Sequence, residues 1–419
     1  MRRILGAAAA IAVLSAVPVG VAGAQSIAAP ATSASPGASV TSAAAGGGLT
    51  QPYATVLTGV LAVIVALIVL AGVLLTRRTS ERQFAQRQQL DQAHFEQLHA
   101  ADRIRGLRAR YTTCAEQLAH TGPVVRQAGI YALAALADDW NDTLPGDSTE
   151  LHDEARVCLD LLCAYLRSST SAADFEVRLS AASVIRRHRE QWSRYTYDLP
   201  DADLSRVDLN NANLRSAELA RTNLAQANLR VADLTAADLT AADLSRANLH
   251  ETELKSARLS EARLPAANLL GANLGSADLV DADLVAADLR AVHLTEANLT
   301  GADLSGANLT GAQLDRANVT GAKLTGANLT SANLTGADLG GASLTDAELS
   351  RANLSGADLT VAYLDRANLT DADLTGADLT GTDLTGANLT GVTHDETTRW
   401  PEGFTPPPAH AAAGDDESA

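Results

Sequence analysis

An aliphatic side chain occupies every fifth position of the second half of the chain, from Leu199 to Leu389. These 39 positions follow one another without a change of phase, and all are leucine except Val319. The residue two places before each of them is nearly always small, as at Ala202. A step of five turns side chains by about 140° on an α-helix and alternates them between the faces of a strand. The leucines and the small residues can all point inward only if the backbone turns a corner about every five residues. This spacing therefore predicts a solenoid.

The five-residue units are alike in sequence, as Ala-Asn-Leu-Thr-Ser at 327–331 and Ala-Asp-Leu-Thr-Val at 357–361 illustrate. They resemble the pentapeptide-repeat family. The resemblance implies a mainly β domain over residues 196–392, a right-handed quadrilateral β-helix with four units per turn and about ten coils. The leucine and the small residue would fill the interior, and the other three positions would face water. A narrow interior explains why Tyr363 is the one aromatic residue between Leu199 and Leu389.

Apolar residues at helical spacing predict a small α-helical domain over residues 111–195, before the repeats. The segments 124–136, 150–166 and 174–188 are amphipathic, with a break over 141–146. The first and third segments resemble each other and look like HEAT-type helices. Similar helical regions precede the repeats in membrane-anchored bacterial pentapeptide-repeat proteins. We expect this domain to cap the β-helix, whose open end would expose unpaired backbone.

The sequence beyond the last repeat predicts a second cap. Residues 393–405 contain Trp400 and Phe404, which we expect to fold over the last coil. Residues 406–419 are rich in proline and alanine and then acidic, so we expect a disordered tail.

The N-terminal region carries targeting signals. Arg2 and Arg3 precede an apolar run, and the sequence Ala-Gly-Ala ends at residue 24, so residues 1–24 are typical of a signal peptide, or of an uncleaved anchor. Residues 25–52 are rich in Ala, Ser, Gly and Pro, which predicts a disordered linker. Residues 53–75 contain no charge and are long enough for one transmembrane helix.

The charges beside this span predict its orientation. Arg77, Arg78, Arg82 and Arg87 follow it, whereas the linker has no Lys or Arg. The positive-inside rule then puts the repeats in the cytoplasm, on a single-pass protein of the cell (inner) membrane. The orientation is the same whether or not the first segment is cleaved.

Residues 76–110 are polar and favour a helix, which predicts a stalk leaving the membrane. Its apolar stripe is broken and includes Phe84, Phe95 and Leu98. The stripe allows a homodimer through residues 79–110 as a coiled coil, and a single amphipathic helix lying on the membrane is the alternative.

Charge limits the partners of the repeats. The chain carries a net charge of −17, and residues 199–392 contain 26 Asp and Glu against 13 Lys and Arg. This surface disfavours direct nucleic-acid binding and favours basic partners, although a soluble surface explains it too.

The chain contains no His-Glu-x-x-His metal motif, no Gly-x-x-x-x-Gly-Lys-Ser/Thr phosphate loop and no Gly-x-Ser-x-Gly nucleophile motif. The three cysteines lie beyond the span in no Cys-x-x-Cys pair, which fits reduced thiols in a helical core. We therefore expect no enzyme activity, no cofactor and no metal site.

If one coil takes 20 residues, the position before each leucine divides into four columns, one on each side of the β-helix. Two neighbouring columns hold most of the carboxylates, and the other two are mostly asparagine. The carboxylates of this candidate interaction edge are Glu218, Asp238, Asp278, Asp338, Asp358 and Asp378 in one column, and Asp203, Asp243, Asp283, Asp303 and Asp383 in the next. Stacked like charges repel, so the edge suggests use by a partner, although loose selection on an exposed surface explains it equally well.

Two functions fit these features. The first is a non-enzymatic scaffold, a membrane-tethered rod that faces the cytoplasm and offers a flat wall to a protein of unknown identity. The second follows from the family resemblance: some soluble pentapeptide-repeat proteins mimic DNA and inhibit or protect type II topoisomerases. The predicted membrane anchor, the unbroken register and the lack of a C-terminal dimerisation helix depart from that pattern.

Overall fold

The computed structural model describes residues 51–142, 149–168 and 174–408 of the 419-residue chain. The expected signal peptide at 1–24, nearly all of the linker at 25–52 and most of the tail at 406–419 lie outside the described residues. The chain divides into two compact units, Met1–Leu90 and Asp91–Ala419, and each is described by itself.

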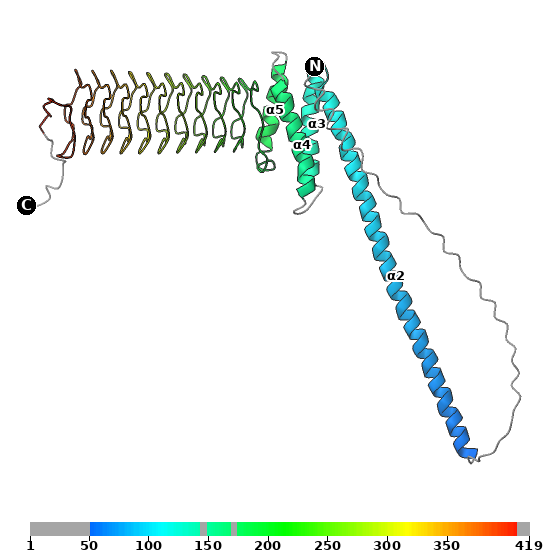
Figure 1. Ribbon diagram of the computed structural model, residues 1–419. Coiled ribbons are helices and arrows are strands. Elements are labelled where there is room, and N and C mark those ends of the chain that lie inside the picture. Colours follow the sequence, from blue (N-terminus) through cyan, green and yellow to red (C-terminus); the bar gives the residue numbers. More distant parts are fainter. Residues whose placement is uncertain (1–50, 143–148, 169–173, 409–419) are drawn as a thin grey trace, which may run out of the picture. The chain divides into compact units, whose positions relative to one another are not determined.

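Helix α2 spans Gln51–Leu118, a length of 68 residues (Figure 1). Pro52 lies in its first turn, where a missing backbone N–H removes no helical hydrogen bond. Residues 51 and 52 are thus helical, whereas the sequence analysis assigned them to the linker. The segments 53–75 and 76–110 belong to this one helix, which continues beyond the expected end of the stalk.

Three shorter helices follow, α3 at Pro123–Asp142, α4 at Thr149–Ser168 and α5 at Phe175–Arg187. Helices α3 and α4 contain the amphipathic segments 124–136 and 150–166, and α5 lies within the segment 174–188. Helix α3 packs against both α4 and α5, and Ile130 and Trp140 of α3 are buried between them. The core of the helical domain is thus built around α3.

The three cysteines lie buried in this helical core as free thiols. Burial raises the pKa of both Cys158 and Cys163 to about 12. The thiols therefore stay protonated near neutral pH, which suits packing rather than reactivity.

The repeats form coils of 20 residues. From Asp198 to Asp373, each residue before a leucine makes a parallel β-bridge with the residue 20 positions later, as Asp198 does with Glu218 and Asp203 with Asn223. Because these bridges recur every five residues, each coil has four sides, as in the quadrilateral β-helix. The bridges are isolated and do not extend into strands. A corner every five residues leaves too little extended backbone on each side for a regular strand.

Hydrogen bonds between coils pair most of the backbone. The Leu199 N–H donates to the carbonyl of Glu218 at 2.8 Å, and the Glu218 N–H donates to the carbonyl of Tyr197 at 2.9 Å. At the corner, the Asp201 N–H donates to the carbonyl of Ala220 at 3.0 Å. The same pattern repeats along the domain, so the coils are joined on all four sides.

Every corner uses the left-handed backbone conformation. The corner residue, two places after each leucine, has a positive φ at all 39 corners from Asp201 to Gly391. Only 13 of these corner residues are glycine. An L-residue there costs roughly 1–2 kcal/mol relative to its usual conformation. The inter-coil hydrogen bonds and the buried leucines offset this strain.

The leucine column and the small residues form one continuous core with the helical domain. The first outward residue on each of the four sides of the β-helix contacts this helical domain. The contacts are Arg167 with Asp198, Arg178 with Asp203, Arg186 with Asp208, and Asn213 with the carbonyl of Arg189. At the other end, Trp400 stacks on Phe404 with ring centroids 5.3 Å apart, and both pack against the core.

Candidate interaction faces of the repeat domain

The bridges arrange the outward residues into four faces, which we name after their first residues. The Asp198 face continues through Glu218 and Asp238, the Asp203 face through Asn223 and Asp243, and the Asp208 and Asn213 faces follow in turn. All eleven carboxylates of the candidate edge lie on the Asp198 and Asp203 faces, six on the first and five on the second. The columns drawn from the sequence therefore exist in the structure.

Most of these carboxylates have a local structural role. The Oδ1 atom of Asp358 accepts a hydrogen bond from the N–H of Thr360 at 2.8 Å, and Asp383 accepts one from Thr385 at 2.9 Å. The same contact with the residue two places later occurs at the other aspartates of the edge, Asp203, Asp238, Asp243, Asp278, Asp283, Asp303, Asp338 and Asp378. This contact pairs the one N–H of each unit that the coils leave free, and asparagine makes it equally well. An acidic residue here is thus no indication of a partner by itself.

Basic residues 20 or 21 positions away neutralise part of the edge. Asp238 pairs with Arg258 at 2.6 Å, and Asp378 pairs with Arg399 at 2.9 Å. Longer pairs join Asp303 to Lys323 at 3.5 Å and Asp243 to Arg263 at 3.8 Å, and Asp203 pairs with Arg178 of α5. The acidic edge is therefore interrupted.

The remaining carboxylates of the edge make no ion pair within the described residues. They are Glu218, Asp278, Asp283, Asp338, Asp358 and Asp383. Asp338 and Asp358 are successive members of the Asp198 face, and Asp383 lies in the neighbouring column. Three of the six unpaired carboxylates, Asp338, Asp358 and Asp383, therefore lie on the C-terminal coils, and the other three lie between residues 218 and 283.

Hydrogen bonding sets the acidity of the paired carboxylates. Partial desolvation alone would raise the pKa of Asp238, but hydrogen bonds from Arg258 and Thr240 outweigh it and lower the pKa to about 2. Hydrogen bonds from Thr380 and Arg399 lower the pKa of Asp378. These groups stay ionised throughout the physiological range.

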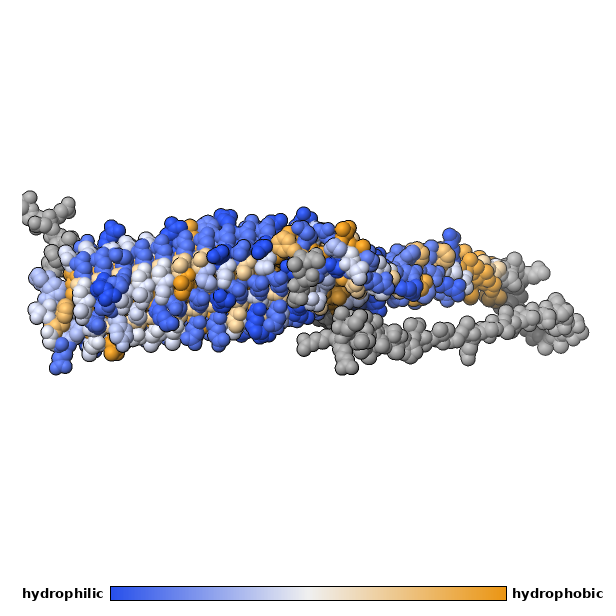
Figure 2. All heavy atoms as spheres, turned by 90° about the horizontal axis from the view of Figure 1, so that it is seen from above, coloured by the Kyte–Doolittle hydropathy of each residue, from blue (hydrophilic) through white to orange (hydrophobic). Residues whose placement is uncertain are grey.

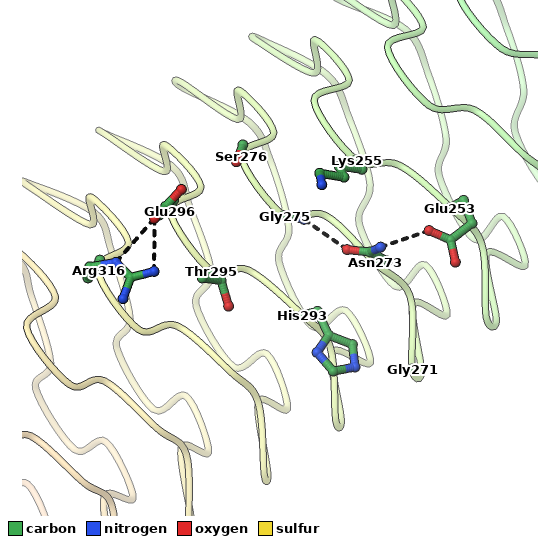
Figure 3. A pocket seen from close by; sticks show the side chains of 10 residues that line it. All are labelled: Glu253, Lys255, Gly271, Asn273, Gly275, Ser276, His293, Thr295, Glu296 and Arg316. Carbon is green, nitrogen blue, oxygen red and sulfur yellow. Dashed lines mark hydrogen bonds and ion pairs between the residues drawn. The ribbon is translucent and has the colours of Figure 1, made fainter.

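The other two faces are more neutral, and the Asn213 face carries a shallow hollow (Figure 3). Its volume is about 510 Å³, and it opens where Gly275 leaves no side chain between Lys255 and Thr295. Asn273 crosses its floor and donates to Glu253 at 2.7 Å. The hollow is lined by both acidic and basic side chains, Glu253 and Glu296 with Lys255 and Arg316. Within the described residues, no three His, Cys, Asp or Glu side chains gather as metal ligands.

Two exposed apolar residues stand out on the repeat surface, and only one of them was singled out from the sequence. The side chains of Val361 and Tyr363 are strongly exposed on a polar surface. The isolated tyrosine was visible in the sequence. The valine did not stand out, because the same corner position holds many different residues in the other units.

Comparison with known proteins identifies the family of the repeats. The family model described as pentapeptide repeats matches eight copies, over residues 198–235, 232–269, 257–295, 287–326, 322–360 and 352–391. No curated protein matches the chain.

Solved structures of repeat proteins are similar to the repeat domain. HetL, a pentapeptide repeat protein involved in heterocyst differentiation regulation in the cyanobacterium Nostoc, is 36% identical and covers 50% of this chain and 93% of its own, with a TM-score of 0.24. A pentapeptide repeat protein from the cyanobacterium Cyanothece is 33% identical, over 28% of this chain and 90% of its own, with a TM-score of 0.17. QnrB1, a plasmid-mediated fluoroquinolone resistance protein, is 21% identical, over 45% of this chain and 92% of its own, with a TM-score of 0.22.

Proposed function

The chain belongs to the pentapeptide-repeat family, and on that premise we propose that it is a non-enzymatic interaction rod held at a membrane by the first part of α2. The comparisons indicate no catalytic family. The rod would offer its flat faces to a protein partner.

The apolar start of α2 is the observation that carries this proposal. The helix is long and apolar enough to cross a membrane, and none of its apolar window is buried in the structure. Figure 2 shows apolar residues gathered over this part of the helix, while most of the visible repeat surface is hydrophilic. The apolar side chains between Val56 and Leu75 are exposed, which would be costly in water and favourable in lipid.

The charges at the end of this segment support an orientation. Arg77, Arg78, Arg82 and Arg87 lie on the helix directly after the apolar stretch. Arginine is enriched on the cytoplasmic side of membrane spans. The protein is thus proposed to be single-pass in the cell membrane, with the repeats in the cytoplasm.

The form of the repeat domain supports an interaction role. Its backbone is paired between coils, and its outward side chains are mostly small and polar, so the four faces are stiff and flat. Its negative surface disfavours direct nucleic-acid binding. We also propose that the chain forms a homodimer through a coiled coil of residues 79–110. The apolar side chains of Phe84, Leu90 and Phe95 are exposed on this part of α2.

The rival proposal is a DNA mimic that inhibits or protects a type II topoisomerase. The carboxylate columns favour it, whereas Arg258, Arg263 and Lys323 interrupt both acidic faces. A DNA gyrase supercoiling assay with the full chain in detergent separates the two proposals. Dose-dependent inhibition at sub-micromolar protein would favour the mimic, and unchanged supercoiling would favour the rod.

Membrane fractionation with a topology reporter tests the rod directly. We expect the full chain to stay in the membrane pellet after carbonate extraction, and a phosphatase that works only outside the cytoplasm to be inactive when fused after Ala419. A variant with Leu67→Arg and Leu70→Arg should shift to the soluble fraction, because each arginine costs about 2.5–3.5 kcal/mol at the centre of a span. Wild-type chain in the soluble fraction would refute the anchor, and an active phosphatase would refute the orientation.

A further inference from the structure

One unit of the repeat domain presents two large apolar side chains to solvent. Val361 is 61% exposed and Tyr363 is 54% exposed, more than any other large apolar residue of the repeats. Tyr363 is also the only aromatic residue between residues 199 and 392. The two residues lie two positions apart, at the corner where the Asp198 face meets the Asp203 face.

Val361 is held in a conformation that its side chain disfavours. It is a corner residue with a φ of 54°, and a β-branched residue in the left-handed region is a genuine outlier. The corners directly before and after it in the same column are Gly341 and Gly381, which adopt this conformation without strain. The fold requires this conformation at every corner, so the strain at position 361 comes from the valine side chain, which the glycines at the neighbouring corners lack.

The two glycines leave space around Val361. A side chain at position 341 would meet nothing within 4 Å, and one at position 381 would contact Cγ1 of Val361 at 3.7 Å. The valine therefore stands between two corners without side chains. A partner's side chain can reach it from along the rod.

Carboxylates without a basic partner border the same corner. Asp358 lies in the same unit, three residues before Val361, and Asp338 precedes it in the column. Asp383 is bridged to Tyr363 itself, with the Leu364 N–H donating to its carbonyl at 2.8 Å. All three side chains are exposed, and none makes an ion pair within the described residues.

We propose that Val361, Tyr363, Asp358 and Asp383 form a docking site for an arginine- or lysine-bearing segment of a protein partner. This inference rests on the proposed role of the repeats as an interaction rod, and it names the surface and the chemistry of the partner. A tyrosine ring attracts a guanidinium group over its face, and a carboxylate beside it accepts paired N–H groups. Tyrosine and arginine are also the residues that dominate binding energy at protein interfaces.

Peptide binding to the full chain in lipid nanodiscs tests this site. The probes are a fluorescent dodecapeptide of alternating arginine and glycine and its glutamate counterpart. We expect only the arginine peptide to bind, and we expect Tyr363→Ser to weaken binding about fivefold, the loss of one exposed cation–π contact. Asp358→Asn, which keeps the local hydrogen bond to Thr360, should weaken binding about threefold.

A matched pair of valine substitutions separates binding from stability. Val361→Gly and Val231→Gly make the same change at a strained corner, and Val231 lies at the corner between the Asp208 and Asn213 faces, away from the proposed site. Both should leave the fold intact. Only Val361→Gly should weaken binding of the arginine peptide, by about threefold if the contact is typical of an interface rim.

Either of two outcomes would overturn the docking site. The first is arginine-peptide binding that is unchanged in Tyr363→Ser and Val361→Gly, and the second is equal loss in Val231→Gly. Neither outcome touches the membrane fractionation result, so a failed docking site is distinguishable from a failed interaction rod.

A photoreactive benzoylphenylalanine at position 363 identifies the occupant in cells. We expect the crosslinked peptide to come from another protein and to contain arginine or lysine. A crosslink to lipid, to a second copy of this chain or to an acidic segment would contradict the inference.

Discussion

The guanidinium group of Arg178, on α5, lies 3.0 Å from the carboxylate of Asp203 in the first coil of the repeats. The Arg178 side chain is only 4% exposed, so its charge has little water to stabilise it. The pair joins the helical domain to the Asp203 face, at the point where the solenoid begins. A buried ion pair is costly to break from one side, because the remaining charge stays buried.

Removal of this carboxylate should destabilise the junction. We expect Asp203→Ala to lower the free energy of unfolding by about 3 kcal/mol. Asp243→Ala is the matched control, because Asp243 lies in the same column and makes the same local hydrogen bond, with Ser245. Its ion pair with Arg263 is exposed and 3.8 Å long, so it should contribute less than about 1 kcal/mol. Equal losses in urea unfolding would show that the buried pair adds nothing.

The single valine of the leucine column predicts a stabilising substitution. Val319 is buried, and the residues before and after it in the stack are leucines, Leu299 and Leu339. Val319→Leu adds one methylene to a site shaped for leucine, which should raise the free energy of unfolding by about 0.8 kcal/mol. A lower thermal midpoint would instead indicate an overpacked interior at this coil.

Relief of strain at a corner should also stabilise the domain. Val231 has a φ of 58°, and glycine there avoids the left-handed penalty at some entropic cost, a net gain of roughly 0.5–1 kcal/mol. Val285 is the control, because it is similarly exposed, at 37% against 39%, but is not a corner residue. Val285→Gly should therefore destabilise. A loss of stability in Val231→Gly, measured by thermal unfolding, would contradict the claim that Val231 is strained at this corner.

The low pKa of Asp238 predicts how acid affects the repeats. Its folded pKa of about 2 lies below the ordinary value of 3.8, so its contribution to stability is complete above pH 4 and is lost as pH falls toward 2. Asp238→Asn keeps the hydrogen bonding capacity but cannot pair ionically with Arg258. The stability gap between wild type and Asp238→Asn in urea unfolding should be constant from pH 7 to 5 and should shrink between pH 4 and 2. A gap that stays constant to pH 2 would exclude the ion pair as its cause.

The inside of the repeat domain could be predicted from sequence because one rule sets it. Leucine at every fifth position, as at Leu199 and Leu204, requires a corner in each unit. The 20-residue coil, which the family resemblance implied, then determined which residues stack, and the bridge of Asp338 with Asp358 follows that register. Burial of the leucines is a repeated local event, so it leaves a repeated signal.

The outside could be predicted only in part, because each contact depends on residues far apart in the chain. The acidic columns were visible, but the hydrogen bond of Asp358 to Thr360 was not, because a carboxylate looks the same in either role. The pairing of Arg178 with Asp203 joins a helix to a coil and leaves no spacing pattern. The strain at Val361 was hidden because a valine in sequence carries no sign of its φ.

Every face and contact of the repeats depends on the 20-residue coil, and distances between spin labels measure that coil directly. Labels at Ser205, Ser245, Ser305 and Thr385 would all lie in one column. With coils about 4.8 Å apart, pulsed electron spin resonance should give narrow distances to Thr385 of about 43, 34 and 19 Å, in proportion to the number of coils between the labels. Broad distributions, or distances that do not grow in proportion to the coils, would contradict the stacked rod.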